Sequence, residues 1–460
     1  MESTVEVKSK INENGEYIAN ELLKFITAKN EARTKGQKQE KRAKRKEMFS
    51  IIEKTGPIEH LHLIDIKFQG HNVEDEYFLT DDQIFAILRR GSSLTYDSQS
   101  KKYNIARSGL VKFFDYKKTY PPNEKSMHRR VCLPMQSSQK KLSVYLTEKA
   151  NGENFQVSYN SQFECFIVGS KNVTIAVRNE EDIEWYIKNG EPKDRYSYCV
   201  DFGRVWFNIV KNKIKDKIDE FKTELGNHTL VGESVGDLTR QHIKLYDERD
   251  IFFYAIVDNT NTNNEICIPM KRAFDLFKKY NLSYVPIEPS ELFDNYDKLK
   301  AYVDIKYDEV LLRKIEQGGE GCVAYFVEVD EKGNEKVLNL AKLKTFDYRF
   351  FRKLREIAKG FRDEKRIKAI SVEKAMKKIK DDSIELLEGK ESEVDFKWYM
   401  EFAEYYFNYV KNDKANYSDV FAEFIREMRN YFANGIKAED IPVMDLHKKV
   451  LSRISKEENE

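Results

Sequence analysis

The feature that most constrains the fold is a series of short, mostly apolar segments of β type between residues 57 and 345. The series reads HLHLIDIKF, KLSVYLTEK, NFQVSYN, FECFIVGS, TLVGES, DIFFYAIVD, CVAYFVEV and KVLNLAKLK. Helical pieces such as VWFNIVKNKIKDKIDEFKTEL and MKRAFDLFKKYN interrupt it. Strands that follow one another, with helices inserted, predict an α+β domain of mostly antiparallel sheets with flanking helices.

The two ends of the chain carry helical patterns instead. Residues 1–56 predict a helical, basic N-terminal segment that Gly56-Pro57 closes. After residue 345, RFFRKLREIAKGF, FKWYMEFAEYYFNYV and YSDVFAEFIREMRNYFANG place apolar residues at helical spacing. A chain of 460 residues is too long for one ordinary core. The sequence therefore predicts three parts: the segment 1–56, an α+β domain at 57–345 and an all-α C-terminal domain at 346–460.

The stretch TEKANGEN, residues 147–154, places a lysine at the end of an apolar strand. Asn151-Gly152 is a strong signal for a two-residue hairpin, which would put Lys149 at the hairpin's rim. There Lys149 is either a surface lysine or a nucleophile. The spacing alone is a weak signal, because Lys67 to Gly70 repeats the same Lys-x-x-Gly pattern.

Further polar groups follow Lys149 in a fixed order, each at the end of an apolar strand. LVGES ends near Glu233, DIFFYAIVD contains Tyr254, GGEGCVAYF begins at Glu320, and LAKLK carries two lysines. Lysines two residues apart share one face of a strand, so Lys342 and Lys344 point the same way. Side chains in these positions can reach a common cleft.

This ordered set resembles the successive motifs of the covalent nucleotidyltransferase superfamily, which comprises DNA ligases, RNA ligases and mRNA capping enzymes. The motifs are KANG, GES, FFYAIVD, EGCV and KLK, and the resemblance covers roughly residues 85–350. The upstream segment RRGSSLTYDSQSKKYNIARSGLVKFFDYKK and the downstream KLKTFDYRFF are similar to fungal tRNA ligases and to the phage RNA ligases that share their architecture. The resemblance implies a ligase-type nucleotidyltransferase fold and an ATP-dependent RNA ligase.

The resemblance also implies a set of site residues, with Lys149 as the catalytic nucleophile. The nucleotide-binding residues that it implies are Arg90, Lys112, Phe114, Gly152, Lys171, Glu233, Tyr254, Glu320, Lys342, Lys344 and Tyr348. Candidate RNA contacts are Arg349, Arg352, Lys353 and Arg355, where basic residues alternate with aromatic ones. The alternative for this segment is an amphipathic helix with a solvated face.

The resemblance gives each group a chemical role. Arg90 and Lys112 would face the ATP phosphates, and Tyr254 would stack on adenine. Glu233 would hold a ribose hydroxyl or contribute to the metal site, and Glu320 would hold Mg²⁺, or Mn²⁺ in its place, through water. Lysine attacks phosphorus only when neutral, so we expect burial and neighbouring cations, namely Lys342, Lys344 and a bound Mg²⁺, to lower the pKa of Lys149.

The implied reaction joins RNA ends that carry a 5′-phosphate and a 3′-hydroxyl, through lysyl-AMP and an RNA-adenylate. The RNA could be tRNA, in repair or splicing. We find no GxxxxGK[ST] loop and no paired HxT motif, so separate kinase and phosphatase enzymes would heal the ends. The enzyme is expected to act as a monomer. It is expected in the cytoplasm, or in the nucleus if the basic run at 41–46 is a targeting signal rather than a phosphate-binding patch or a solvated helix face.

Two departures from the family bear on the alternatives. Asn154 stands where DNA ligases usually carry an arginine, and the end of the chain reads as helices rather than as an OB-fold. Both departures count against a DNA ligase or a capping guanylyltransferase. A catalytically silent RNA-binding relative is the remaining alternative. Asp115 stands where the RNA ligase branch often has Asn.

Other features of the sequence bound the protein more loosely. His60 and His62 lack an evident third partner, so a structural role is predicted for them rather than a metal site. The five cysteines show no CxxC and no pairable pattern, which indicates reduced thiols. The sequence contains no apolar run long enough to cross a membrane.

Overall fold

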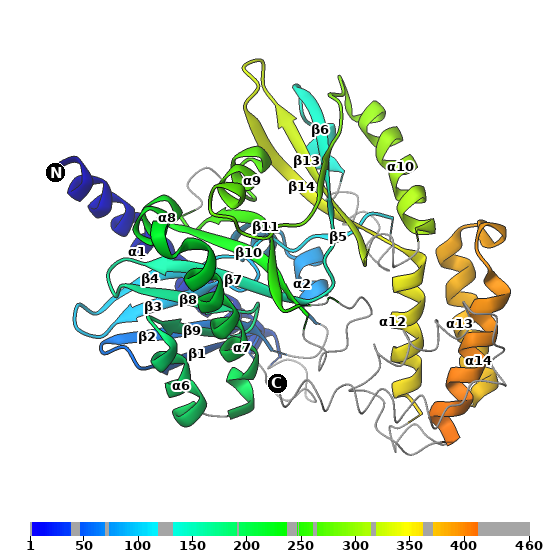
Figure 1. The fold of residues 1–460 in the computed structure, drawn as a ribbon, viewed down its shortest axis with the longest axis horizontal. Helices are drawn as coiled ribbons and strands as arrows, with labels where there is room; N and C mark the ends of the chain where they lie inside the picture. Colours follow the sequence, from blue (N-terminus) through cyan, green and yellow to red (C-terminus); the bar gives the residue numbers. More distant parts are fainter. Residues whose placement is uncertain are drawn as a thin grey trace.

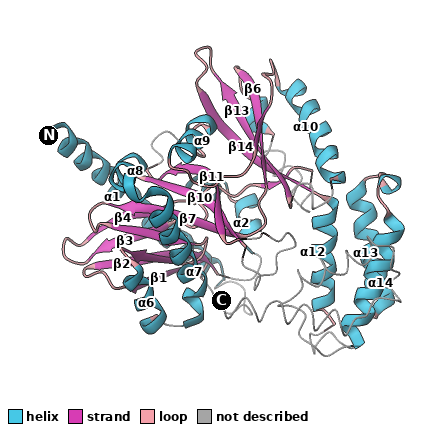
Figure 2. Cartoon of the chain, in the orientation of Figure 1, coloured by secondary structure: helices cyan, strands magenta, loops and turns pink. Residues whose placement is uncertain are grey.

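The computed structural model confirms a mixed α+β fold with antiparallel sheets and a helical region towards the C-terminus (Figure 1; Figure 2). It describes residues 2–37, 47–69, 73–117, 132–190, 193–236, 246, 248–260, 265–313, 319–361 and 371–412. The basic run at 41–46 and the predicted helix at 417–435 lie outside these residues.

The first sheet, called the N-terminal sheet, is antiparallel with the strand order β1-β2-β3-β4. Its strands are β1 (Phe49–Thr55), β2 (Leu61–Phe68), β3 (Ser93–Asp97) and β4 (Lys102–Arg107). Helix α1 (Glu2–Gln37) packs on β4. The short helices α2 (Val73–Thr80) and α3 (Asp82–Ile87) form the connection along the chain from β2 to β3. The helical prediction is therefore wrong for residues 49–55. They pair with β2 along their whole length, which satisfies their backbone hydrogen bonds, and Phe49 at their start is buried.

The second sheet, called the β7 sheet, has the order β11-β10-β7-β8-β9, and all its pairs are antiparallel. Its strands are β7 (Glu153–Asn160), β8 (Cys165–Gly169), β9 (Thr174–Val177), β10 (His228–Val235) and β11 (Asp250–Asp258). Around it lie α6 (Glu180–Asn189), α7 (Lys193–Ile209), α8 (Ile218–Leu225) and α9 (Met270–Lys279). Trp206 of α7 is fully buried against the sheet.

The third sheet, called the β6 sheet, has the order β12-β6-β13-β14-β5, with β5 parallel to β14. Its strands are β5 (Phe114–Asp115), β6 (Lys141–Glu148), β12 (Ile287–Pro289), β13 (Gly321–Val329) and β14 (Glu335–Lys344). Helices α5 (Leu133–Gln136) and α10 (Tyr296–Leu312) accompany it. Strand β13 reads as almost continuously apolar because both of its faces are buried: Ala324 and Phe326 face one core cluster, and Val323 and Tyr325 the other.

The chain between 346 and 412 is helical wherever the structure describes it (Figure 2). Helices α12 (Phe346–Lys359), α13 (Val372–Leu387) and α14 (Phe396–Asn412) pack on one another. Thr345 caps α12 by accepting a hydrogen bond from the Tyr348 N–H, and Ser371 caps α13 in the same way. Because only Thr345 separates the end of β14 from the start of α12, the first turn of α12 lies beside the lysines at the end of that strand.

The predicted hairpin at Asn151-Gly152 is wrong. Strand β6 pairs with β12 and β13, whereas β7 pairs with β8 and β10, so the two strands lie in different sheets. The connection at residues 149–152 passes from one sheet to the other. An Asn-Gly pair favours a tight turn locally, but the pairing partners of the flanking strands are set by packing far along the chain.

Candidate active site

Lys149 lies at the point where the chain leaves the β6 sheet for the β7 sheet. Its backbone N–H donates to the carbonyl of Gly321 at 2.8 Å, which fixes it beside the start of β13. Gly152 approaches β10 so closely that a Cβ there would lie 2.1 Å from the carbonyl oxygen of Ser234. The glycine of the KANG motif is therefore required by close backbone packing, which brings Lys149 to the mouth of a cleft between the two sheets.

This cleft, called the Lys149 cleft, has a volume of about 840 Å³. Strands β6, β7, β10, β11, β13 and β14 and helix α12 all contribute to its wall. Of the predicted residues, those that line it are Arg90, Lys149, Gly152, Lys171, Glu233, Tyr254, Glu320, Lys342, Lys344, Tyr348, Arg352 and Arg355. The structure thus brings most of the predicted set into one cavity.

The nucleophile candidate is held in an ion pair. The Nζ atom of Lys149 lies 2.7 Å from Oε2 of Glu320. Burial disfavours the ammonium form, but the carboxylates of Glu320 and Glu233 outweigh it and raise the pKa of Lys149. Burial and the two lysines alone therefore do not lower this pKa as expected, and without nucleotide and metal Lys149 is a charged ammonium.

The two carboxylates of the cleft are shifted in opposite directions. Burial, opposed by Lys149 and reinforced by Glu320, raises the pKa of Glu233 to about 7. Burial acts in the same sense on Glu320, but Lys149 and Lys344 together hold its pKa below the usual range. Glu320 is thus ionised at neutral pH, whereas Glu233 is poised between its two forms.

The paired lysines of β14 point into the cleft, as their spacing predicts. Nζ of Lys344 lies 3.6 Å from Glu320 and 3.5 Å from Asp115. Lys342 stands over the ring of Phe113 at 4.9 Å, and burial and the charge of Lys344 lower its pKa far below the ordinary value. Lys344 thus supplies positive charge beside Lys149, whereas Lys342 holds its proton less tightly.

Aromatic side chains form part of the wall. The hydroxyl of Tyr254 accepts a hydrogen bond from Nδ2 of Asn154 at 3.0 Å, and the ring of Tyr348 lies 5.4 Å from Nζ of Lys344. Phe114 does not line the cleft, contrary to the prediction. It is buried in the hydrophobic core on β5, and the preceding Phe113 faces the cleft, because neighbouring strand residues point to opposite sides.

The upstream cations meet carboxylates that sequence reasoning missed. Nε of Arg90 lies 2.9 Å from Glu74, and Lys112 forms an ion pair with Asp75. Burial would raise the pKa of both acids, but the surrounding cations lower it, and Lys171 adds to this effect at Glu74. The acidic first turn of α2 was visible in VEDEYFLT, but nothing in the sequence indicated that it lies on these cations.

A second cleft, called the α12 cleft, adjoins the first and has a volume of about 1180 Å³. It lies between β2, α2, α12 and α13, and it shares Arg90, Lys171, Lys342 and Lys344 with the Lys149 cleft. The predicted residues that line the α12 cleft alone are Lys112, Arg349 and Lys353. Lys67, the second Lys-x-x-Gly lysine, also lines it but not the Lys149 cleft.

The histidine pair lies at the turn before β2 and at the start of that strand. Nδ1 of His62 lies 2.7 Å from Glu53 on the neighbouring strand, and His60 has a positive φ at the preceding turn. Across the described ranges, no three His, Cys, Asp or Glu side chains gather as ligands for a metal ion. None of the helices within these ranges is long and apolar enough to cross a membrane.

One family model matches the part of the chain that contains the cleft. Residues 142–344 match the family model described as RNA ligase. A search of curated proteins finds no significant match. That family match runs from β6 to the end of β14 and includes Lys149, Glu233, Tyr254, Glu320 and the two lysines of β14.

Similar solved structures include an archaeal ATP-dependent RNA ligase, with 12% identity and a TM-score of 0.45, covering 85% of this chain and 80% of that chain. A Naegleria gruberi RNA ligase variant with ATP and Mn has 14% identity and a TM-score of 0.30, covering 47% and 53%. A putative ATP-dependent DNA ligase from Aquifex aeolicus has 12% identity and a TM-score of 0.37, covering 86% and 80%. Residues 142–344 are therefore similar to the RNA ligase family over a region that contains the Lys149 cleft.

Proposed function

We propose that this protein is an ATP-dependent RNA ligase that joins a 5′-phosphate and a 3′-hydroxyl through a lysyl-AMP intermediate. One observation supports the proposal above all. Lys149, Glu233, Glu320, Lys342 and Lys344 come from the ends of three strands and the turn before β13, and they line one cleft within the matched region. This arrangement offers a nucleophile, fixed cations and carboxylates around a space large enough for a nucleotide.

In the first step Nζ of Lys149 would attack the α-phosphorus of ATP. A P–N bond forms, the P–O bond to pyrophosphate breaks, and the amine gives up a proton. Lys342 and Lys344 would stabilise the charge that develops on the phosphate, and Tyr254 would contact the adenine. Before this step Lys149 must leave its ion pair with Glu320, because the ammonium has no lone pair.

The carboxylates suit a divalent metal held mostly by water and phosphate. Glu320 would hold Mg²⁺ or Mn²⁺ through water, with Glu233 as a second contact or as the partner of a ribose hydroxyl. When bound, the metal supplies positive charge at the phosphates. With its own charge directed to the metal, Glu320 would no longer hold Lys149 as an ammonium, and the pKa of Lys149 would fall.

The α12 cleft supplies a candidate surface for the RNA. Arg349, Arg352 and Lys353 project from α12 into it, and Arg355 from the same helix lines the Lys149 cleft. Arg352 lies 3.1 Å from Glu356, and Lys353 2.9 Å from Asp382, so phosphates would compete with these pairs. AMP would pass from Lys149 to an RNA 5′-phosphate, and a 3′-hydroxyl would then displace AMP.

The biological setting completes the proposal. The substrate would be broken RNA, with tRNA as one candidate, in repair or splicing. Separate kinase and phosphatase enzymes would prepare the ends, and the ligase would work as a monomer in the cytoplasm or nucleus. All five cysteines are free thiols in the structure, in keeping with a reducing compartment. The three-part division of the chain, with the C-terminal helices selecting RNA, belongs to the same proposal.

Labelling of the protein tests the activity. The purified protein is treated with pyrophosphate to remove any bound AMP, incubated with Mg²⁺ and α-labelled ATP or GTP, denatured and examined for label. We expect label from ATP on the unmodified protein and on Lys67→Ala, but none on Lys149→Ala. Lys67 is a matched control because it has the same local motif and lines the neighbouring cleft.

The other outcomes separate the alternatives. Label from GTP alone would favour a capping guanylyltransferase. Label from ATP with joining of nicked DNA but not of RNA would favour a DNA ligase. No label from either nucleotide would overturn the enzyme proposal and favour a catalytically silent RNA-binding relative.

A further inference from the structure

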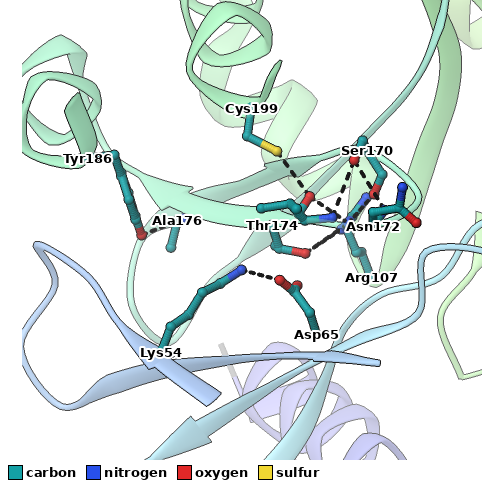
Figure 3. A network of polar contacts seen from close by, with 10 residues as sticks. Lys54, Asp65, Arg107, Ser170, Asn172, Thr174, Ala176, Tyr186 and Cys199 are labelled. Carbon is teal, nitrogen blue, oxygen red and sulfur yellow. Dashed lines mark hydrogen bonds and ion pairs between the residues drawn. The ribbon is translucent and has the colours of Figure 1, made fainter. Parts of the chain in front are cut away.

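A buried arginine lies behind the Lys149 cleft, at the end of β4. Arg107 is 1% exposed, and burial lowers its pKa to about 10, so it remains charged at neutral pH. Its Nη2 donates to the carbonyls of Ser170 at 2.5 Å and Val173 at 3.2 Å and to Oγ1 of Thr174 at 2.8 Å (Figure 3). Its Nη1 donates to Oε1 of Gln156 at 2.8 Å. A buried guanidinium with these fixed acceptors imposes direction on the polar groups that it contacts.

The direction of the Gln156 amide follows from this contact. Since Oε1 of Gln156 accepts a hydrogen bond from Arg107, the Nε2 group of Gln156 points away from the arginine. It donates to the carbonyl of Arg90 at 3.1 Å and to Oδ1 of Asn154 at 2.9 Å. Reversal of the amide would set an NH₂ group against a cation that can only donate, so one orientation is strongly favoured.

The orientation of the Gln156 amide in turn fixes the orientation of the Asn154 amide, which contacts Tyr254. With Oδ1 accepting from Gln156, Nδ2 of Asn154 donates to the hydroxyl of Tyr254 at 3.0 Å. That hydroxyl therefore acts as an acceptor towards Asn154, and its own hydrogen remains to be donated to a group in the Lys149 cleft, which Tyr254 lines. Burial raises the pKa of Tyr254, so this hydrogen is retained at neutral pH.

The arginine also holds the turn that carries Lys171. The Ser170 N–H donates to the Val173 carbonyl at 3.0 Å, and Oγ of Ser170 accepts from the Asn172 N–H at 3.1 Å. Arg107 contacts the carbonyl groups at both ends of this turn, which presents Lys171 to the cleft. The N-terminal sheet thereby supplies a rigid support for the site even though its strands do not carry the nucleophile.

We propose that Arg107 and Gln156 are positioning residues that orient the Asn154 amide so that the hydroxyl of Tyr254 donates a hydrogen bond to an acceptor atom of the bound nucleotide. The proposal rests on the proposed function, in which ATP occupies the Lys149 cleft. Within that function it assigns to Tyr254 a donor role in addition to the stacking role of its ring.

The test is a double-mutant cycle on ATP binding, measured by calorimetry with the full chain. In Gln156→Glu the carboxylate still accepts from Arg107 but cannot donate to Asn154, so the Asn154 amide reverses and the Tyr254 hydroxyl becomes a donor to it. We expect ATP to bind about tenfold more weakly, the loss of about one hydrogen bond to the ligand. In Tyr254→Phe, which lacks the hydroxyl, adding Gln156→Glu should weaken binding no further.

Controls and alternative outcomes keep the proposal falsifiable. Gln83→Glu makes the same chemical change at an exposed position outside both clefts and should leave ATP affinity unchanged. If Gln156→Glu does not fold, Asn154→Asp reverses the same hydrogen bond at a less buried position, with the same expected coupling to Tyr254→Phe. The hydrogen-bond relay from Arg107 through Gln156 and Asn154 to Tyr254 would be overturned by either of two results. One is that the losses of ATP affinity add in the double variant, and the other is that the single variant loses no affinity.

Labelling of Lys149 is measured in parallel to separate the two proposals. ATP binding with the expected coupling but without label would keep the relay and reject the ligase activity. Label on Lys149 with additive losses would keep the ligase and reject the relay. If the unmodified protein does not bind ATP at all, both proposals fail.

Discussion

The substitution Glu233→Gln should make the protein more stable at pH 8 while it impairs the proposed reaction. Burial raises the pKa of Glu233 from its ordinary 4.5 to about 7. Between these pH values the folded protein holds a proton on Glu233 that the unfolded chain has lost. The folded state of the unmodified protein is therefore favoured at low pH, and this advantage disappears as the pH rises through 7. Glutamine has no such titration, so the variant escapes the loss.

The magnitude follows from the pKa difference. A shift of about 2.5 units corresponds to about 3.4 kcal/mol when complete, at about 1.36 kcal/mol per unit. Over the window from pH 5 to pH 8, the free energy of unfolding of the variant should gain about 2.5 kcal/mol on that of the unmodified protein. Nearly all of this gain should occur below pH 7, because Glu233 is mostly ionised above that value.

Urea unfolding of both proteins at several pH values measures this difference, and Lys149 labelling at pH 8 measures the cost in activity. Glu224→Gln is a control whose stability difference should stay flat between pH 5 and pH 8 and change only at lower pH. Lys279 and Tyr280 hydrogen-bond to Glu224 and lower its pKa, so its contribution is present above its unfolded pKa and is lost as the pH falls. A stability difference for Glu233→Gln that does not grow between pH 5 and pH 8 would refute the placement of Glu233 beside Glu320 in a buried site.

Two further predictions concern the charged walls of the clefts. In the double variant Glu74→Gln and Asp75→Asn, Arg90 and Lys112 lose their carboxylate partners and become available to the ATP phosphates. We therefore expect a lower KM for ATP in the labelling reaction. An increased KM would instead indicate that the acids help to bind the nucleotide. In Arg349→Gln and Lys353→Gln, we expect labelling of Lys149 to persist and RNA binding to weaken. The slope of log affinity against log salt concentration should fall by about 0.7 for each lost phosphate contact. An unchanged slope in a binding titration would exclude these residues from the RNA surface.

The sequence by itself selected most of the candidate residues that the structure brings into one cleft. Apolar runs of β type marked the strands, and polar residues near their ends gave the candidates Lys149, Glu233, Glu320 and the lysine pair, whereas Tyr254 lies in the middle of β11. This succeeds because strand ends open onto surfaces and because alternation along a strand is a local property. Lys342 and Lys344 share a face for that reason alone, whatever strands lie beside them.

The tertiary structure decided the matters that depend on distant partners. Strands β6 and β7 flank an Asn-Gly pair but belong to different sheets, and residues 49–55 form an edge strand because β2 pairs with them. Phe113 rather than Phe114 faces the cleft because β5 lies parallel to β14 with Phe114 in the core.

Electrostatics is the clearest case of information that only the fold contains. From Lys342 and Lys344, which follow in the chain, the sequence predicted a lowered pKa for Lys149. In the fold, the carboxylates of Glu320 and Glu233 act on Lys149 more strongly than burial does, and its pKa is raised. In the same way α2 places its acids on Arg90 and Lys112, and β4 places Arg107 behind the cleft. Charge interactions depend on distance and burial in space, and both are fixed only when segments far apart in the chain pack together.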